Sequence, residues 1–165
     1  LGLACQRGSD DGGRPASGGL YVDPVSGALS KPVDRAVVAS LAEECGQLFD
    51  DTAGHLEELM SLVALQSGSC ARVGHRLQAF LSAHGLNDGL RFESFAERLW
   101  MRSRKEANLV IQRSQQRIER RMARFKTRLS QRKKALDAFA ERCPDAAADV
   151  QAALERFLEQ TVAGN

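Results

Sequence analysis

The chain has 165 residues, enough for one domain and a tail, with a hydrophobic fraction of 43%, an aromatic fraction of 5% and a formal net charge of +2. No apolar run approaches the roughly 18 residues that a membrane-spanning helix needs, which excludes such a helix and predicts a soluble folded body. Few aromatic residues and many Ala, Leu, Arg, Glu and Gln residues favour helix over sheet.

The first residues, LGLAC, resemble the end of a bacterial lipoprotein signal, in which the cysteine is lipidated and becomes the new N-terminus. Ala4 before Cys5 fits that pattern, whereas Gly2 departs from it because Leu is usual there. The resemblance implies that Cys5 carries a lipid anchor. Because Gln6 rather than Asp follows the cysteine, it also implies the outer membrane as the destination. The alternative is an unmodified cysteine in a disordered tail.

Residues 6–29 are predicted to be a flexible linker. Their first part, QRGSDDGGRPASGG, has Ala16 as its only apolar side chain and cannot bury a core. A flexible coil of this length spans roughly 27 Å, the reach of a tether between a bilayer and a folded domain. The folded domain is expected over 30–165, with Ser30 as a plausible cap of its first helix.

Four helices are expected in the folded domain. Apolar residues at helical spacing predict a first helix over 33–67, and Pro144 can open a last one. The chain between them has a strong turn signal, HGLNDG, at 84–89, and then neither Gly nor Pro from 93 to 142.

The length of the third helix leaves two interpretations. Helical propensity favours one continuous helix over 91–142, but that helix would be about 78 Å long and could not pack in a compact bundle with its shorter neighbours. A turn near 102–107 instead gives helices over 70–102 and 107–142, similar in length to the first. We prefer the turn, which predicts an all-α fold: an antiparallel bundle of about four helices.

The remaining cysteines predict one disulfide if the protein is exported to an oxidising compartment. Cys70 begins the second helix and Cys143 ends the third, so a hairpin that turns near 102–107 brings both to the same end of the bundle. Cys45 lies on an apolar helix stripe and is expected to be a buried thiol. The alternative is that all three are reduced core residues of a cytosolic protein. No CxxC spacing indicates a zinc framework.

Three segments of the folded domain, SCARVGHRLQAF, ALDAFAERCPD and VQAALERFL, resemble small helical secreted lipoproteins of Gram-negative bacteria. The similarity covers roughly 56–162, and the HGLNDG interruption departs from the simplest form of that pattern. The resemblance implies a helical, exported, lipid-anchored protein, but no activity that can be assigned to named residues.

No motif predicts catalysis, a metal or another cofactor. HLEEL at 55–59 is not the HExxH motif, and His55 with Glu57 lacks the PCxxC that zinc deaminases add. His75 and His84 have no carboxylate or cysteine at ligand spacing. No CxxCH, GxSxG or phosphate-binding loop is present. The methionines that could ligate haem in a bundle core are expected to be packing residues: Met60, Met101 and Met122.

Charge is distributed very unevenly. Residues 98–134 contain 14 Lys and Arg against Glu106 and Glu119, whereas the rest of the chain has 9 basic and 19 acidic residues. One interpretation is that this basic helix pairs with acidic helices of the same bundle. The other is a cationic face that binds phosphates of lipid head groups or lipopolysaccharide. The candidate anion-binding residues are Arg113, Arg117, Arg120, Arg121, Arg124, Lys126 and Arg128.

The leading hypothesis is a non-enzymatic lipoprotein on the periplasmic side of the cell envelope, acting by binding or as a structural element. The alternatives are a nucleic-acid-binding helical protein that uses the 98–134 stretch, and a periplasmic helical chaperone. Nucleic acid ranks low because a lipidated envelope protein rarely meets it and because aromatics are absent between Trp100 and Phe125. The chaperone hypothesis lacks the LTxxQ repeat of known examples.

Overall fold

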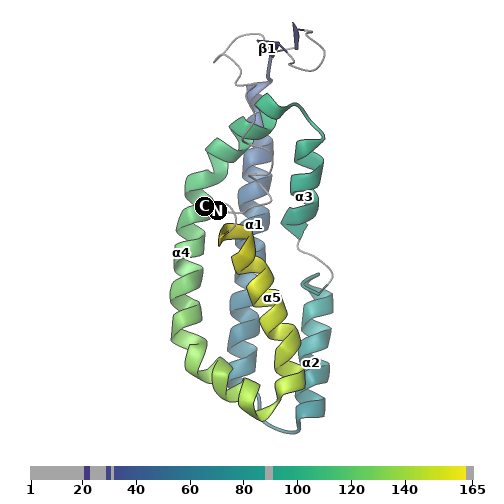
Figure 1. The fold of residues 1–165 in the computed structure, drawn as a ribbon, viewed down its shortest axis with the longest axis vertical. Helices are drawn as coiled ribbons and strands as arrows, with labels where there is room; N and C mark the ends of the chain where they lie inside the picture. The colour runs from purple at the N-terminus through teal and green to yellow at the C-terminus, as the bar shows by residue number, and fades with distance from the viewer. Residues whose placement is uncertain (1–20, 23–28, 31, 88–90, 163–165) are drawn as a thin grey trace.

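The computed structural model describes residues 21–22, 29–30, 32–87 and 91–162 (Figure 1). Apart from a pair of two-residue strands, β1 (Tyr21–Val22) and β2 (Leu29–Ser30), the regular structure in these residues is helical, so the predicted all-α class is confirmed. The five helices are α1 (Arg35–Leu65), α2 (Cys70–Ala83), α3 (Arg91–Trp100), α4 (Arg104–Arg142) and α5 (Pro144–Val162).

Side-chain caps set where three of the helices begin. The Asp34 carboxylate accepts a hydrogen bond from the Ala36 N–H, so α1 starts at residue 35, and Ser30, the predicted cap, lies in β2 instead. Ser69 caps α2 and Ser103 caps α4 in the same way. The break between α3 and α4 falls at 101–103, so the turn predicted near 102–107 exists and lies slightly earlier in the chain.

Helix α4 lies beside α1 and runs in the same direction, as Figure 1 shows. Arg117 pairs with Asp50, Arg121 with Glu57 and Arg142 with Gln66, so partners advance together along both helices. The α1–α4 interface is the largest between helices. The predicted antiparallel bundle of about four helices is therefore not confirmed, for two reasons. The described chain has five helices, because the HGLNDG segment separates α2 from α3, and its main interface joins parallel helices.

The core is a single cluster to which all five helices contribute. At its centre, Phe157 of α5 packs against Phe49 of α1 and Phe125 of α4, with ring centroids 5.0 and 4.8 Å apart. Leu81 of α2 and Leu99 of α3 are buried in the same cluster. Because three rings from three helices meet there, the position of α4 against α1 and α5 is closely defined.

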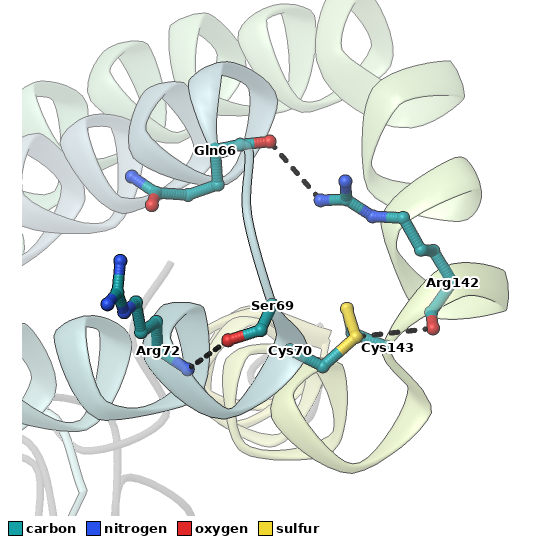
Figure 2. Close-up of a disulfide and its surroundings, with 6 residues drawn as sticks. All are labelled: Gln66, Ser69, Cys70, Arg72, Arg142 and Cys143. Carbon is teal, nitrogen blue, oxygen red and sulfur yellow. Dashed lines mark hydrogen bonds between the residues drawn. A yellow bond between two sulfur atoms is a disulfide. The ribbon is translucent and has the colours of Figure 1, made fainter.

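At one end of the bundle, a disulfide links the start of α2 to the junction between α4 and α5 (Figure 2). Cys70, the first residue of α2, is bonded to Cys143, which lies between α4 and α5, with Cα atoms 5.5 Å apart. Next to it, Arg142 donates a hydrogen bond of 3.2 Å to the carbonyl oxygen of Gln66, the C-cap of α1. The structure thus contains the predicted cysteine pair, and Cys45 keeps its thiol and is fully buried.

Within the described residues, no helix combines the length and the apolar character needed to cross a bilayer. The predicted lipidation residue, Cys5, lies outside the described residues. Of the predicted linker 6–29, only 21–22 and 29 are described, and these residues belong to the β1–β2 pair.

Candidate anion-binding face on helix α4

All seven basic residues predicted to bind anions lie on α4, but the structure divides them into two groups. Arg117, Arg121 and Arg128 lie along the edge of α4 that faces α1 and pair with its carboxylates. The other four side chains are exposed, and in the described part of the chain they have no acidic partner: Arg113, Arg120, Arg124 and Lys126.

Arg117 makes the most extensive of these ion pairs. Its Nε and one terminal nitrogen donate to Asp50 Oδ2 at 3.1 and 2.8 Å, and the other terminal nitrogen donates to Glu43 Oε1 at 3.1 Å. The hydrogen bond to Asp50 is the main reason why the pKa of Arg117 rises above its ordinary value, followed by the bond to Glu43 and opposed by burial. These contacts stabilise the charged guanidinium against α1, so the donors of Arg117 already have acceptors within the chain.

Arg121 and Arg128 share the carboxylate of Glu57. Both terminal nitrogens of Arg121 donate to Glu57, and Arg128 Nε lies 3.4 Å from Glu57 Oε2. The side chains of Arg121 and Glu57 are only 12% and 15% exposed, so this pair is largely desolvated. A desolvated two-point contact fixes the register of α4 on α1 more firmly than a surface pair would.

The sequence contains a signal for this pairing that our interpretation did not use. Glu43, Asp50 and Glu57 are spaced seven residues apart, which places them along one line of α1. All three accept hydrogen bonds from α4. The prediction that the basic helix pairs within the bundle is therefore correct for part of the stretch, and it competes with the prediction of a binding face.

Arg113, Arg120 and Arg124 form a second line, which we call the arginine stripe. Their spacings of seven and four residues place them within about 40° of each other around α4, on its solvent side. Lys126 lies elsewhere around the helix and is not part of the stripe. The stripe is about 17 Å long at 1.5 Å per residue.

The stripe can bind a row of phosphates or carboxylates. A guanidinium presents planar pairs of N–H donors that match the oxygens of these anions. The nearest acidic residue in sequence, Glu119, already accepts a hydrogen bond of 3.0 Å from Gln115. An anionic partner could therefore accept hydrogen bonds from the guanidinium groups of the stripe without breaking an ion pair seen in the described residues.

A comparison of the chain with known proteins found no matching family model, no matching curated protein and no matching solved structure. The functional argument consequently depends on the residues of the chain and their geometry.

Proposed function

We propose that the protein is a non-enzymatic helical binding module of the bacterial cell envelope. In this proposal lipid on Cys5 holds it on the periplasmic side of the outer membrane, and the arginine stripe binds anionic envelope components. The observation that carries the proposal is the exposure of Arg113, Arg120 and Arg124 without an acidic partner in the described residues, beside arginines that are paired. Pairing within the bundle explains the α1-facing arginines and leaves the stripe unexplained.

A lipid on Cys5 and a cationic stripe would act together. A single acyl chain gives only marginal membrane binding, and stable attachment needs a second signal such as further acyl chains or a basic patch. Each Lys or Arg near an anionic surface adds about 1 kcal/mol of binding free energy. Three arginines in line would therefore add about a hundredfold to the partition of the domain onto an anionic surface.

The binding proposal is tested on protein in which Cys5→Ser removes the lipidation site, so that lipid cannot contribute to binding. Sedimentation with phosphatidylglycerol vesicles and with lipopolysaccharide is measured at low and high salt. The triple variant R113Q/R120Q/R124Q is compared with a control that removes the same charge from exposed positions elsewhere, R35Q/R72Q/K134Q. We expect the stripe variant to lose on the order of a hundredfold in affinity, and the control to lose much less.

Three results would contradict the binding proposal. Equal losses in both triple variants would indicate a general charge effect and no site. Absence of binding to either anionic surface at low ionic strength would remove the stripe as a contact surface. Tighter, stripe-dependent binding to a DNA duplex than to the envelope components would favour the nucleic-acid alternative.

The tether is tested separately by mass spectrometry of the protein purified from its own cells. We expect a diacylglyceryl adduct on Cys5 and recovery in the outer-membrane fraction. An unmodified Cys5 in protein recovered from the cytoplasm would remove the envelope location, whatever the stripe binds.

A further inference from the structure

Helix α1 and the end of α2 bring together three metal-ligating side chains away from the arginine stripe. One donor atom each from His55, Glu58 and His84 lies within 4.8 Å of the other two. His55 and Glu58 are three residues apart on α1, so their side chains lie on one face of the helix. His84 is the C-cap of α2. Sequence spacing did not predict this group because the fold brings the third donor from another helix.

The backbone at the end of α2 holds His84 in place. The Leu86 N–H donates to the Leu81 carbonyl at 2.8 Å, and the Gly85 N–H donates to the Ser82 carbonyl at 3.3 Å. Gly85 has a positive φ of 62°, so these bonds form the helix-ending motif that requires glycine at this position. Leu81 and Leu86 are both buried, which fixes the turn to the core. The backbone position of His84 is therefore set before any ligand binds.

The two imidazoles already touch. The ring centroids of His55 and His84 are 4.0 Å apart with an interplanar angle of 27°, and Phe80 packs against His84 at 4.4 Å. A tetrahedral ion with bonds of about 2.0 Å holds its donors roughly 3.3 Å apart and in the ring planes. Both histidines are partly exposed, so a side-chain rotation can unstack the rings and bring their nitrogens onto one ion without moving the core.

The charges around the cluster favour a cation. Asp51 and Glu58 on α1 and Arg91 at the start of α3 interact electrostatically with His55, so two carboxylates and one guanidinium lie near this imidazole. Glu58 is exposed and both histidines are partly exposed, so water can reach the three donors.

We propose that His55, Glu58 and His84 bind one divalent transition-metal ion, with Zn²⁺ the best match, and that water completes the coordination. Two imidazoles and one carboxylate are a ligand set that Zn²⁺ accepts in proteins, usually with a water in the fourth position. Imidazole nitrogens select zinc, copper and nickel over magnesium and calcium, which prefer oxygen ligands. Binding joins α1 to the end of α2, and no reaction is assigned to the ion.

The experiment uses the full, untagged chain with Cys5→Ser, so that this thiol cannot compete for zinc. Zn²⁺ is titrated by calorimetry, and the imidazole ¹⁵N signals are followed by NMR during the same titration. The variants are H55Q, H84Q and E58Q. The matched control is H75Q, because His75 is the remaining one of the chain's three histidines, is exposed on α2 and lies outside the cluster.

We expect one Zn²⁺ per chain, with the signals of His55 and His84 shifted and that of His75 unchanged. H55Q, H84Q and E58Q should each weaken binding by about tenfold or more, whereas H75Q should not. The NMR result on the unaltered site holds even if a variant folds poorly. The proposal is overturned if no zinc binds, if the shifts include His75 but not His84, or if H75Q weakens binding as much as H55Q.

Discussion

The side chain of Arg117 on α4 lies directly over Gly46 of α1. A Cβ built on Gly46 would lie 2.7 Å from Arg117 Cδ and 2.9 Å from its Nε, closer than real Cβ contacts. Gly46 is buried, and the guanidinium beyond it is held by Asp50 and Glu43. The absence of a side chain at Gly46 thus leaves room for the Arg117 side chain to lie over α1 and reach Asp50 and Glu43. It also lets the two parallel helices approach each other.

The first prediction compares Gly46 with Gly54, which lies two turns later in the same helix and has nothing within 4 Å of a built Cβ. Gly54→Ala should raise the free energy of unfolding by about 1 kcal/mol, the gain in helix propensity. Gly46→Ala should lose that gain, because the added methyl group displaces Arg117 from its carboxylates. Urea denaturation of the two variants measures the difference.

A double-mutant cycle identifies the cause. In an Arg117→Ala background the clash at Gly46 is absent, so Gly46→Ala should become stabilising by about the same 1 kcal/mol as Gly54→Ala. If Gly46→Ala has the same effect on the free energy of unfolding with and without Arg117, another neighbour of Gly46 is responsible and the contact with Arg117 is not the reason.

The second prediction concerns the largely buried pair of Arg121 and Glu57. Arg121→Ala should lower the free energy of unfolding by about 2 kcal/mol, because Glu57 keeps only the long, exposed contact with Arg128. Arg120→Ala is the matched control: the same substitution one residue away, on the exposed stripe, should cost no more than about 0.5 kcal/mol. Equal effects in chemical denaturation would mean that the pair contributes nothing specific.

Local sequence rules predicted some helix boundaries of this fold, such as the start of α2 at Cys70, the end of α4 at Arg142 and the start of α5 at Pro144, whereas the predicted cap Ser30 lies in β2. Ser69 and Ser103 cap helices because their side chains satisfy N–H groups that no carbonyl can reach, and Pro144 starts α5 because it lacks an N–H. The hairpin turn near 101–103 followed from length alone, since a continuous helix could not pack. That turn in turn placed Cys70 beside Cys143.

Contacts between distant helices could not be predicted in the same way. The packing of α4 on α1 depends on how the hairpin formed by α2, α3 and α4 is oriented relative to α1. Helix α4 also carries arginines on several of its faces. The acidic line on α1 therefore indicated that pairing occurs without identifying which arginines pair. His84 likewise reaches His55 only because the turn after α2 folds back on α1.

The third prediction concerns the disulfide, which closes a loop with a sequence separation of 73 residues. Limiting the unfolded chain in this way should contribute about 4 kcal/mol of stability. The double variant C70S/C143S should lose that amount in urea denaturation. Peptide mapping without reductant should recover the two cysteines as one linked pair.

Reductant provides the control for the disulfide. It should destabilise the wild-type protein by a similar amount and leave C70S/C143S unchanged, because Cys45 is buried and is not part of the bond. A wild-type protein that is insensitive to reductant would show that the bridge does not form in solution, or that the bundle does not depend on it.

The fourth prediction is a pH dependence from His55, whose pKa is lowered from the ordinary value of 6.5 by burial and then by the neighbouring His84, against the opposing effects of Asp51 and Glu58. The unfolded chain therefore takes up a proton at this residue at a higher pH than the folded chain does. The stability contribution of neutral His55 is complete above pH 6.5 and is lost as the pH falls from 6.5 through the folded pKa.

Chemical denaturation in the presence of a chelator, from about pH 7.5 to about pH 5.5, covers this window while staying above the ordinary pKa values of carboxylates. The free energy of unfolding should fall toward acid in the wild type and in His75→Gln, and the fall should be smaller in His55→Gln. Because His84 shifts the pKa of His55 in the same direction as burial, His84→Gln should also reduce the slope. An unchanged slope in His55→Gln would show that the acid sensitivity arises from other groups and that the stacked imidazoles are not coupled to folding.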